Sequence, residues 1–498
     1  MGEGKLYKSG LKKAVRYSVG GSAISQAIML LVAPIITRLY GPEDLGTFAV
    51  YMALGTFISM SIFFRYELAI ALSRSLTTTL SVLKLCLSIG VIYCVSLTVV
   101  FYAAGEVVLD AIGLSTFSSF IMLIPFLAFT LGLMCLIQFW LVKAARFDIL
   151  GSCKIALSAL LSLIQVLLGF LKVGGVGLII GHFIGLTIVV FGLIWFVFRR
   201  YFFALPRIKL GKIKQAAIRF NNFPKYTILS DSLMTLGGQA PPIIIASLFS
   251  LNLAGFFALA YRIVLAPVAL VAEGVGKVFM AKALMVKDDG DFPLFVGSVY
   301  SSLLGVSLVP FVLLGLVATD LVSLIFGAKW MESGIYISLL IPIAFAMFVY
   351  IPMMTLYLVL EKQKYELRLQ TVILIFRVTG LLVGGYFGGI FWAVLLYSLL
   401  ACIGYLIAGF WIMGQSGIKF GQLFKITLME VLISLVLLAP ITLFKLYISS
   451  YYELFFESSK MGFYTLFLLT LLAVFYRARR SIQLLVEPDL ANLTTTRK

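Results

Sequence analysis

Apolar runs of membrane-spanning length follow one another along almost the whole chain. A bilayer core needs roughly 20 apolar residues per helix, and 62% of the 498 residues are hydrophobic while only 12% are charged. The runs lack the alternation of polar and apolar residues that a membrane β-barrel requires. The sequence therefore predicts an all-α, polytopic membrane helix bundle with about fourteen spans. We place them at residues 17–38, 46–64, 80–103, 117–141, 154–171, 174–198, 227–250, 254–273, 296–318, 335–360, 371–388, 390–413, 426–446 and 462–476.

Lysine and arginine are concentrated in alternate connecting segments. If the N-terminus is cytoplasmic, the inner segments hold 31 of the 39 basic residues and the outer segments hold five. The densest segment, 199–226, contains eight basic residues and no acidic one. Because such segments resist translocation, we expect both termini in the cytoplasm. This bias explains the net charge of +18 without a nucleic-acid partner.

An internal repeat is visible between the two halves of the chain. Residues 36–49 align with 245–258 at an offset of 209, which pairs Gly46 with Gly255, and residues 167–175 align with 381–389 at an offset of 214. Two six-span halves joined by a basic inner segment are typical of transporters. We expect two six-helix lobes in a pseudo-twofold repeat, plus two peripheral C-terminal helices. The predicted domains are an N-lobe at 1–198, a basic cytoplasmic linker at 199–226, a C-lobe at 227–413, and spans 13–14 with a cytoplasmic tail at 414–498.

Charged residues within or beside the spans are the candidates for function, because burying a charge in hydrocarbon is costly. Arg262 lies deep in span 8, which favours a cavity over snorkelling to the interface. Arg65 and Glu67 close span 2, and a simple pair between them is an equally good interpretation. Arg377, near the inner end of span 11, fits snorkelling as well as binding. The candidates for ion coupling are Glu430, Glu273 and Glu67.

No catalytic or metal-binding motif is found in the sequence. It has no phosphate-binding glycine loop of the Walker type, no HExxH pair and no Cys/His ligand set. Its one histidine, His182, lies in a glycine-rich span, where a packed polar role is the usual one. We therefore expect a transport protein with no cofactor and no metal rather than an enzyme.

The segment from Pro34 to Ser75, PIITRLYGPEDLGTFAVYMALGTFISMSIFFRYELAIALSRS, resembles the opening of bacterial Wzx-type polysaccharide flippases. The element around Arg146, Phe147 and Asp148 is also similar to that family. The family is part of the multidrug/oligosaccharidyl-lipid/polysaccharide exporter superfamily. The resemblance implies two six-helix bundles that work by alternating access in the bacterial inner membrane. It implies an undecaprenyl-pyrophosphate-linked oligosaccharide as substrate, with membrane lipids and other glycan-assembly proteins as partners.

The peptidoglycan-precursor flippase of the same superfamily has a pattern similar to Ala260-Tyr261-Arg262 and an arginine that matches Arg65. This resemblance implies that Arg262 and Arg65 contact the substrate. We add Arg377 as a third candidate for substrate binding from its place in span 11. The span 1 arginines of that flippase are missing, since residues 17–37 carry no charge. The departure argues against a peptidoglycan precursor as cargo and favours O-antigen, capsule or exopolysaccharide intermediates.

Two other functions remain as alternatives. A multidrug-type cation antiporter should have acidic residues deep in its N-lobe, whereas span 1 has none and the deepest charge is Arg262. A membrane glycan polymerase or ligase should have large outer loops, whereas the outer segments here are short. We therefore expect a flippase.

Overall fold

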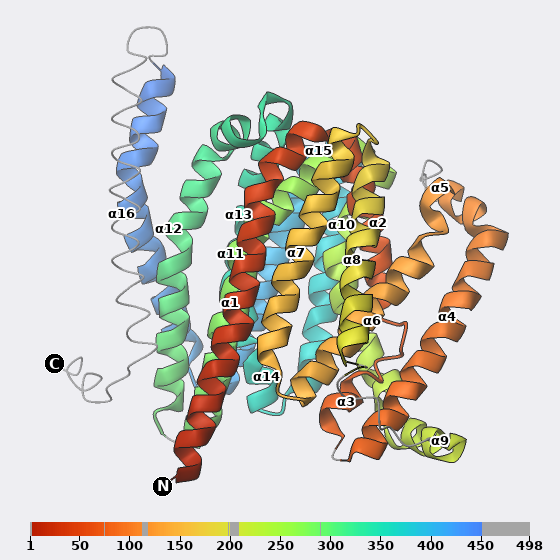
Figure 1. Cartoon of the computed structure of the whole chain (residues 1–498). Helices are drawn as coiled ribbons and strands as arrows, with labels where there is room; N and C mark the ends of the chain where they lie inside the picture. Colours follow the sequence, from red (N-terminus) through yellow and green to blue (C-terminus); the bar gives the residue numbers. More distant parts are fainter. Residues whose placement is uncertain are drawn as a thin grey trace. The chain divides into compact units, whose positions relative to one another are not determined.

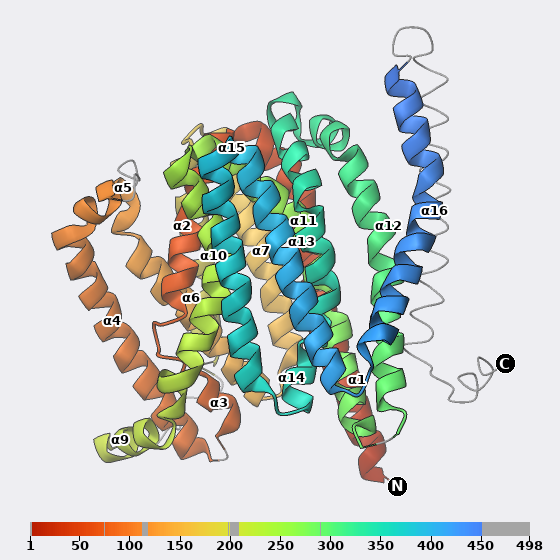
Figure 2. The same cartoon turned by 180° about the vertical axis from the view of Figure 1, so that it is seen from behind.

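The computed structural model describes residues 2–73, 75–111, 118–197, 199, 209–288 and 290–450, and every regular element in these ranges is a helix (Figure 1). Figure 2 shows the same helices from behind. The first half contains α1 (Gly2–Leu39), α2 (Pro42–Ser59), α3 (Leu68–Leu72), α4 (Leu76–Ala111), α5 (Ser118–Ile121), α6 (Ile124–Lys143), α7 (Phe147–Phe170), α8 (Gly175–Val197) and α9 (Leu210–Arg219). Then follow η3 (Phe223–Thr227), α10 (Ile228–Leu248), α11 (Leu251–Val286), α12 (Phe292–Phe326), η4 (Ala328–Trp330), α13 (Met331–Met353), α14 (Thr355–Val359), α15 (Gln363–Gln415) and α16 (Phe420–Ser450).

The predicted all-α polytopic membrane fold is confirmed. Ten helical segments of the described residues are long and apolar enough to cross a membrane. α2 and α10 occupy two further predicted spans, and α15 contains the predicted spans 371–388 and 390–413. The backbone of α15 leaves helical geometry at Gly389, where φ is 74°. Span 462–476 lies outside the described residues. Helices suit this environment because they satisfy every backbone hydrogen bond internally.

The chain forms two compact units. The first contains residues 1–263, 323–333 and 377–393, and the second contains 264–322, 334–376 and 394–498. In the first unit α1 packs along α7, α2 packs against α6, α8 and α10, and α4 packs against α6 and α9. The lobe boundaries given by the sequence stay a prediction.

Small residues bring α1 and α7 together in the first unit. A Cβ placed on Gly21 of α1 would lie 2.5 Å from the Cα atom of Gly151 in α7. Beside this crossing, Lys154 Nζ donates a hydrogen bond to Ser22 Oγ at 2.6 Å. Membrane helices lack a hydrophobic drive to associate, so close packing at small residues and interhelical hydrogen bonds hold such pairs together.

Two helix ends in the two halves have the same backbone conformation. The turn at residues 140–146 and the turn at 356–362 each place a non-glycine residue at positive φ, Ala145 at 53° and Glu361 at 58°. The N–H of the following residue bonds to the carbonyl five residues back, at 2.9 Å in the first turn and 2.7 Å in the second. This is the Schellman helix ending, which usually takes glycine at the positive φ. Its recurrence with a non-glycine residue, 216 positions apart, supports the internal repeat.

Gly46 and Gly255, which the repeat aligns with each other, meet where α2 and α11 begin. A Cβ on Gly46 would lie 1.9 Å from the carbonyl oxygen of Leu251, and one on Gly255 would lie 1.8 Å from that of Pro42. Pro42 and Leu251 are also 209 residues apart. The contact is therefore reciprocal, as expected at an internal twofold axis, and only glycine allows the two backbones to approach so closely.

We expect Gly255→Ala to lower the free energy of unfolding by about 1–3 kcal/mol, because the new methyl group forces the two backbones apart. Thermal unfolding of the purified protein in detergent measures the change. Gly192→Ala in α8 is the matched control, since no described atom beyond the local backbone of its own helix and its chain neighbours lies within 4 Å of the added Cβ. An unchanged melting temperature for Gly255→Ala would contradict the close contact.

The segment that contains η4 closes the C-terminal end of α1. Trp330, which is fully buried, donates from Nε1 to the carbonyl oxygen of Thr37 at 2.9 Å. Lys329 Nζ donates to the carbonyl oxygen of Tyr40, also at 2.9 Å. The last carbonyls of a helix lack partners within it, so these two side chains satisfy groups that the helix leaves open.

Candidate functional site

The turn after α2 is held in an unusual backbone conformation. Phe64 and Arg65 have φ values of 50° and 61°, which cost on the order of 1–3 kcal/mol each for non-glycine residues. The preceding Phe63 is almost fully buried, and its ring lies against Gly90 and Gly132. This packing fixes the turn and sets the direction in which Arg65 leaves the backbone. Strain of this kind gathers at functional sites.

Arg65 bonds to two carboxylates. Its Nε donates to Asp231 Oδ2 at 2.7 Å and its Nη2 to the same oxygen, while Nη1 donates to Glu67 Oε1 at 3.2 Å. The pairing of Arg65 with Glu67 was an alternative from the sequence, and the structure adds Asp231, in the first turn of α10. Sequence reasoning missed Asp231, although it is the only acidic residue of predicted span 227–250 and could have been found on that ground.

Glu67 is the most enclosed member of this ion cluster. The residue is 4% exposed, and its Oε2 atom is buried without a hydrogen-bond partner among the described residues. Burial raises the pKa of Glu67, and the charge of Arg65 offsets part of that rise. One arginine between two carboxylates leaves one negative charge in excess, so Glu67 is the group most ready to take up a proton.

Arg262 lies within the first unit, eleven residues after the start of α11. Its Nη2 atom is 3.5 Å from the carbonyl oxygen of Met29 in α1, which is at the limit of a hydrogen bond. The ring of His182 in α8 contacts the ring of Phe48. His182 is also close enough to Arg262 to interact with its positive charge. Among the described residues, no carboxylate lies within salt-bridge distance of Arg262. A guanidinium has five N–H donors, so Arg262 has further donors that can bind an anion.

Arg377 approaches the same turn of α11. This residue is 5% exposed, and its Nη2 donates to the hydroxyl of Tyr261 at 3.1 Å. The ring of Tyr261 stacks on Phe257 one turn earlier. The structure thus brings Arg377 beside the residue that precedes Arg262. Nothing in the sequence indicates this proximity, and sequence reasoning assigned His182 only a packing role.

Of the two remaining candidates for ion coupling, the structure describes the side chain of Glu430. Glu430 lies in α16 of the second unit, where Ser301 of α12 donates to its Oε1 at 3.1 Å. One turn earlier Thr427 is hydrogen-bonded to Tyr300 at 2.7 Å. The side chain of Glu273 lies outside the described residues.

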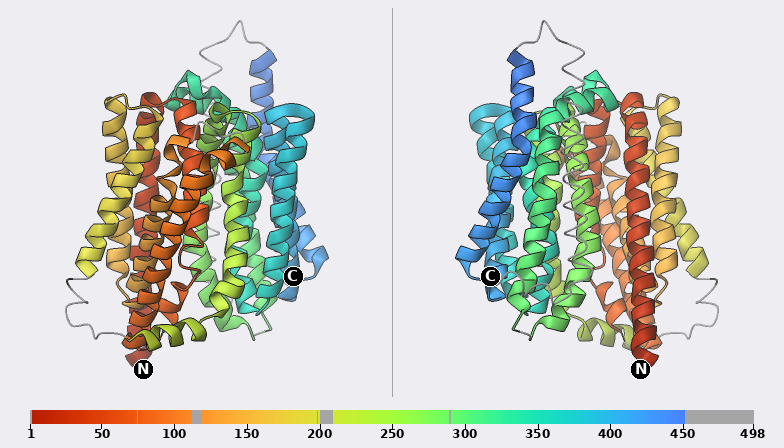
Figure 3. Two further views of the ribbon diagram at one scale, coloured as in Figure 1. Left: turned by 90° about the vertical axis from the view of Figure 1, so that its right-hand side faces the viewer. Right: turned by 90° about the vertical axis from the view of Figure 1, so that its left-hand side faces the viewer.

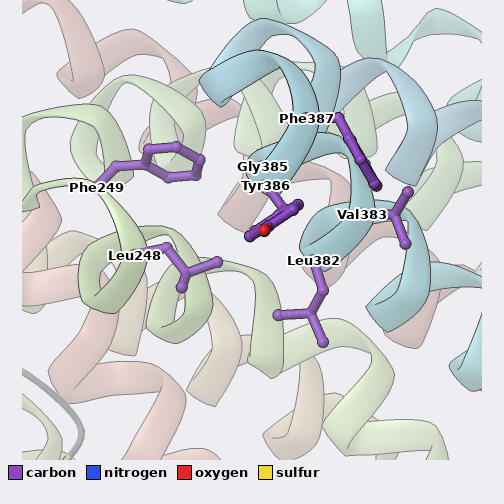
Figure 4. Close-up of a pocket in the computed structure, with 7 residues that line it drawn as sticks. All are labelled: Leu248, Phe249, Leu382, Val383, Gly385, Tyr386 and Phe387. Atoms are coloured by element: carbon purple, nitrogen blue, oxygen red, sulfur yellow. The ribbon is translucent and has the colours of Figure 1, made fainter.

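A cavity of about 450 Å³ lies between the end of α10 and α15 in the first unit (Figure 4). In the close-up, Leu248 and Phe249 lie on one side and Tyr386 at the centre. The lining is Leu248, Phe249, Leu382, Val383, Gly385, Tyr386 and Phe387. No lining side chain carries a charge, so this cavity fits hydrocarbon and not a phosphate. The candidate residues for binding an anion are therefore Arg262, Arg377 and Arg65, and not the lining of this cavity.

Residues 35–334 match a protein family described as "Polysaccharide biosynthesis protein". The chain belongs to the polysaccharide biosynthesis protein family. The resemblance seen from Pro34 to Ser75 is thereby confirmed. None of the curated proteins is significantly similar to this family member in sequence.

Three solved structures with a fold similar to this polysaccharide biosynthesis protein are a flippase and two transporters. The lipid II flippase MurJ in an inward closed conformation has a TM-score of 0.70 and 13% identity, covering 94% of this chain and 99% of that one. The MATE transporter VcmN of Vibrio cholerae has a TM-score of 0.52 and 16% identity, covering 82% and 95%. An inward-facing MATE transporter of the MOP superfamily has a TM-score of 0.56 and 14% identity, covering 80% of this chain and 96% of that one. At these identities the likeness is one of fold.

Proposed function

We propose that this protein moves an undecaprenyl-pyrophosphate-linked oligosaccharide from the cytoplasmic to the outer leaflet of the bacterial inner membrane. The transported intermediate would serve assembly of a surface polysaccharide such as O-antigen, capsule or exopolysaccharide. Membership of the polysaccharide biosynthesis family carries this proposal, and a fold shared with a lipid II flippase over 94% of the chain supports it. Both termini would then lie in the cytoplasm, in agreement with the distribution of basic residues.

The arginines of the first unit suit the charge of such a substrate. A pyrophosphate carries negative charge that must be neutralised within the membrane, and guanidinium binds phosphate through two parallel hydrogen bonds. Arg377 donates a hydrogen bond to Tyr261, the residue before Arg262 on α11, and we assign both arginines to the pyrophosphate together with Arg65. The polyprenyl tail stays in lipid throughout, so only the glycan and phosphates need a sheltered path.

The ion cluster at Arg65 suits a coupling role. Arg65 is held by Glu67 and Asp231, so protonation of a carboxylate weakens its hold on the guanidinium. A proton on Glu67 would release Arg65 toward an anionic substrate, and loss of that proton would withdraw it. Glu430 and Glu273 stay secondary proposals for the same role.

The MATE-like fold favours a second candidate, a cation antiporter. An arginine with unused donors opposes it, because a cationic drug would be repelled at Arg262. Deletion of the gene separates the two functions. We expect loss of surface glycan and accumulation of the lipid-linked oligosaccharide, measured by lectin staining and by analysis of extracted lipids. Unchanged surface glycan with reduced efflux of cationic dyes would support the antiporter instead.

A further inference from the structure

Helix α9 is a short basic helix that packs on the first unit by only one of its faces. It contacts α4, and Tyr66 of the strained turn donates from its hydroxyl to the carbonyl oxygen of Ala217 at 3.2 Å. Ala216 is buried, and Ile213 and Ala217 are partly buried. Residues three and four positions apart share a helix face, so these three alanine and isoleucine side chains form the face toward α4.

A second row of side chains on α9 is left uncovered. Leu210, Lys214 and Ile218 follow one another at intervals of four, so they lie along one side of the helix. Leu210 is 85% exposed and Ile218 is 62% exposed, and Lys214 between them is exposed as well. Two large aliphatic side chains with a lysine between them, open on a ten-residue helix, call for a partner that is both apolar and anionic.

The charges around this row are of one sign. Lys209, Lys212 and Arg219 are exposed beside it, and residues 199–226 include no acidic residue. α4 is a membrane-spanning helix, and α9 lies crosswise at the end where α4 begins (Figure 3). A helix with aliphatic and basic faces, placed flat at the end of a span, is the pattern of an interfacial helix.

We propose that α9 lies in the surface of the cytoplasmic leaflet, with Leu210 and Ile218 among the acyl chains and its basic side chains on anionic phospholipid headgroups. The proposal rests on the orientation given by the basic segments and not on the identity of the transported glycan. Each basic residue near an anionic surface contributes about 1 kcal/mol, a factor of about five in partition. A lipid surface is the partner that fits, because aliphatic and cationic side chains alternate along the row. The segment has no acidic residue that would match a basic protein partner.

The depth of residue 218 in a membrane tests this inference on the full-length protein. Ile218→Cys carries a nitroxide label, and the protein is placed in nanodiscs of phosphatidylcholine alone or mixed with phosphatidylglycerol. Collisions with oxygen report lipid contact, and collisions with a water-soluble nickel complex report water contact. Gln215→Cys is the matched position, because Gln215 is exposed and lies about 100° around the helix from Lys214, at the centre of the aliphatic row. The unsubstituted chain, labelled in parallel, gives the background of its five cysteines.

We expect residue 218 to contact lipid in the anionic discs, several-fold more than residue 215 and more than in discs of phosphatidylcholine alone. Reversal of three α9 charges, Lys212→Glu, Lys214→Glu and Arg219→Glu, should remove this difference. The control reverses three exposed lysines elsewhere, Lys364, Lys419 and Lys425, and should leave it. Equal water contact at 218 and 215, equal depth in both lipids, or equal effects of the two sets of reversals would each overturn the proposal.

Discussion

Replacing Arg262 with alanine is expected to abolish detectable surface glycan while the protein remains in the membrane at its normal level. Among the described residues Arg262 makes one long hydrogen bond, to the carbonyl oxygen of Met29, and no salt bridge, so its removal leaves no described carboxylate without a partner. The loss falls on the substrate instead. A hydrogen bond to a charged group contributes on the order of 1.5–3 kcal/mol, which is roughly a tenfold to hundredfold loss of binding.

Two further variants show whether the guanidinium itself is needed. Arg262→Lys should restore only part of the glycan, because an ammonium keeps the charge but loses the planar pair of donors. Arg368→Ala, at an exposed arginine near the start of α15, should leave glycan display unchanged. Full display by Arg262→Ala at normal expression would refute the assigned role.

Replacing Arg65 with alanine is expected to be the most destabilising single change in the first unit, at about 3–5 kcal/mol. Removal of one partner from a buried ion pair leaves the other charge uncompensated, and here it leaves two carboxylates together. Glu67→Gln in the same background should restore part of the loss, because it removes the charge that has lost its partner. Arg146→Ala is the control, since Arg146 and Asp148 form a half-exposed pair worth about 0–1 kcal/mol.

The loss of stability in Arg65→Ala should depend on pH. Burial raises the pKa of Glu67 above its ordinary value of 4.5, so the folded state favours the protonated carboxyl. The stability gained by protonating Glu67 is fully present at pH values below the pKa of this carboxyl in the unfolded chain. It is lost as the pH rises through the pKa of the same carboxyl in the folded protein. Without Arg65 the pKa rises further, so the variant should melt at a lower temperature at pH 8 than at pH 5. Equal loss at both pH values, or no rescue by Glu67→Gln, would contradict this account of the cluster.

The membrane fold could be predicted from the sequence because it depends on local properties. Span length and hydropathy located α1, α4 and α16, and the short polar segments between the spans marked their ends. The repeat was visible at Gly46 and Gly255 because both are fixed by the same close contact. The break of α15 at Gly389 was also predicted, as the boundary between spans 11 and 12.

The candidate site could be predicted only in part, because its partners are distant in sequence. Arg65 and Asp231 are 166 residues apart, and nothing local indicates that they meet. The same holds for Arg377 and Tyr261, which are hydrogen-bonded although they are 116 residues apart. Arg262 could be identified from the sequence because it is a charged residue within an apolar span, where burying a charge is costly. The proximity of His182 to Arg262 could be recognised only from the folded structure.

The most direct test of the proposed function is translocation by the purified protein in liposomes. Undecaprenyl-pyrophosphate-linked oligosaccharide with a fluorescent sugar is placed in both leaflets, and a membrane-impermeant reductant destroys the outer fluorescence. We predict that the reductant reaches nearly the whole pool with the unsubstituted protein, and only the outer pool with Arg262→Ala or without protein. Protection of the inner pool by liposomes that contain the folded, unsubstituted protein would contradict a flippase.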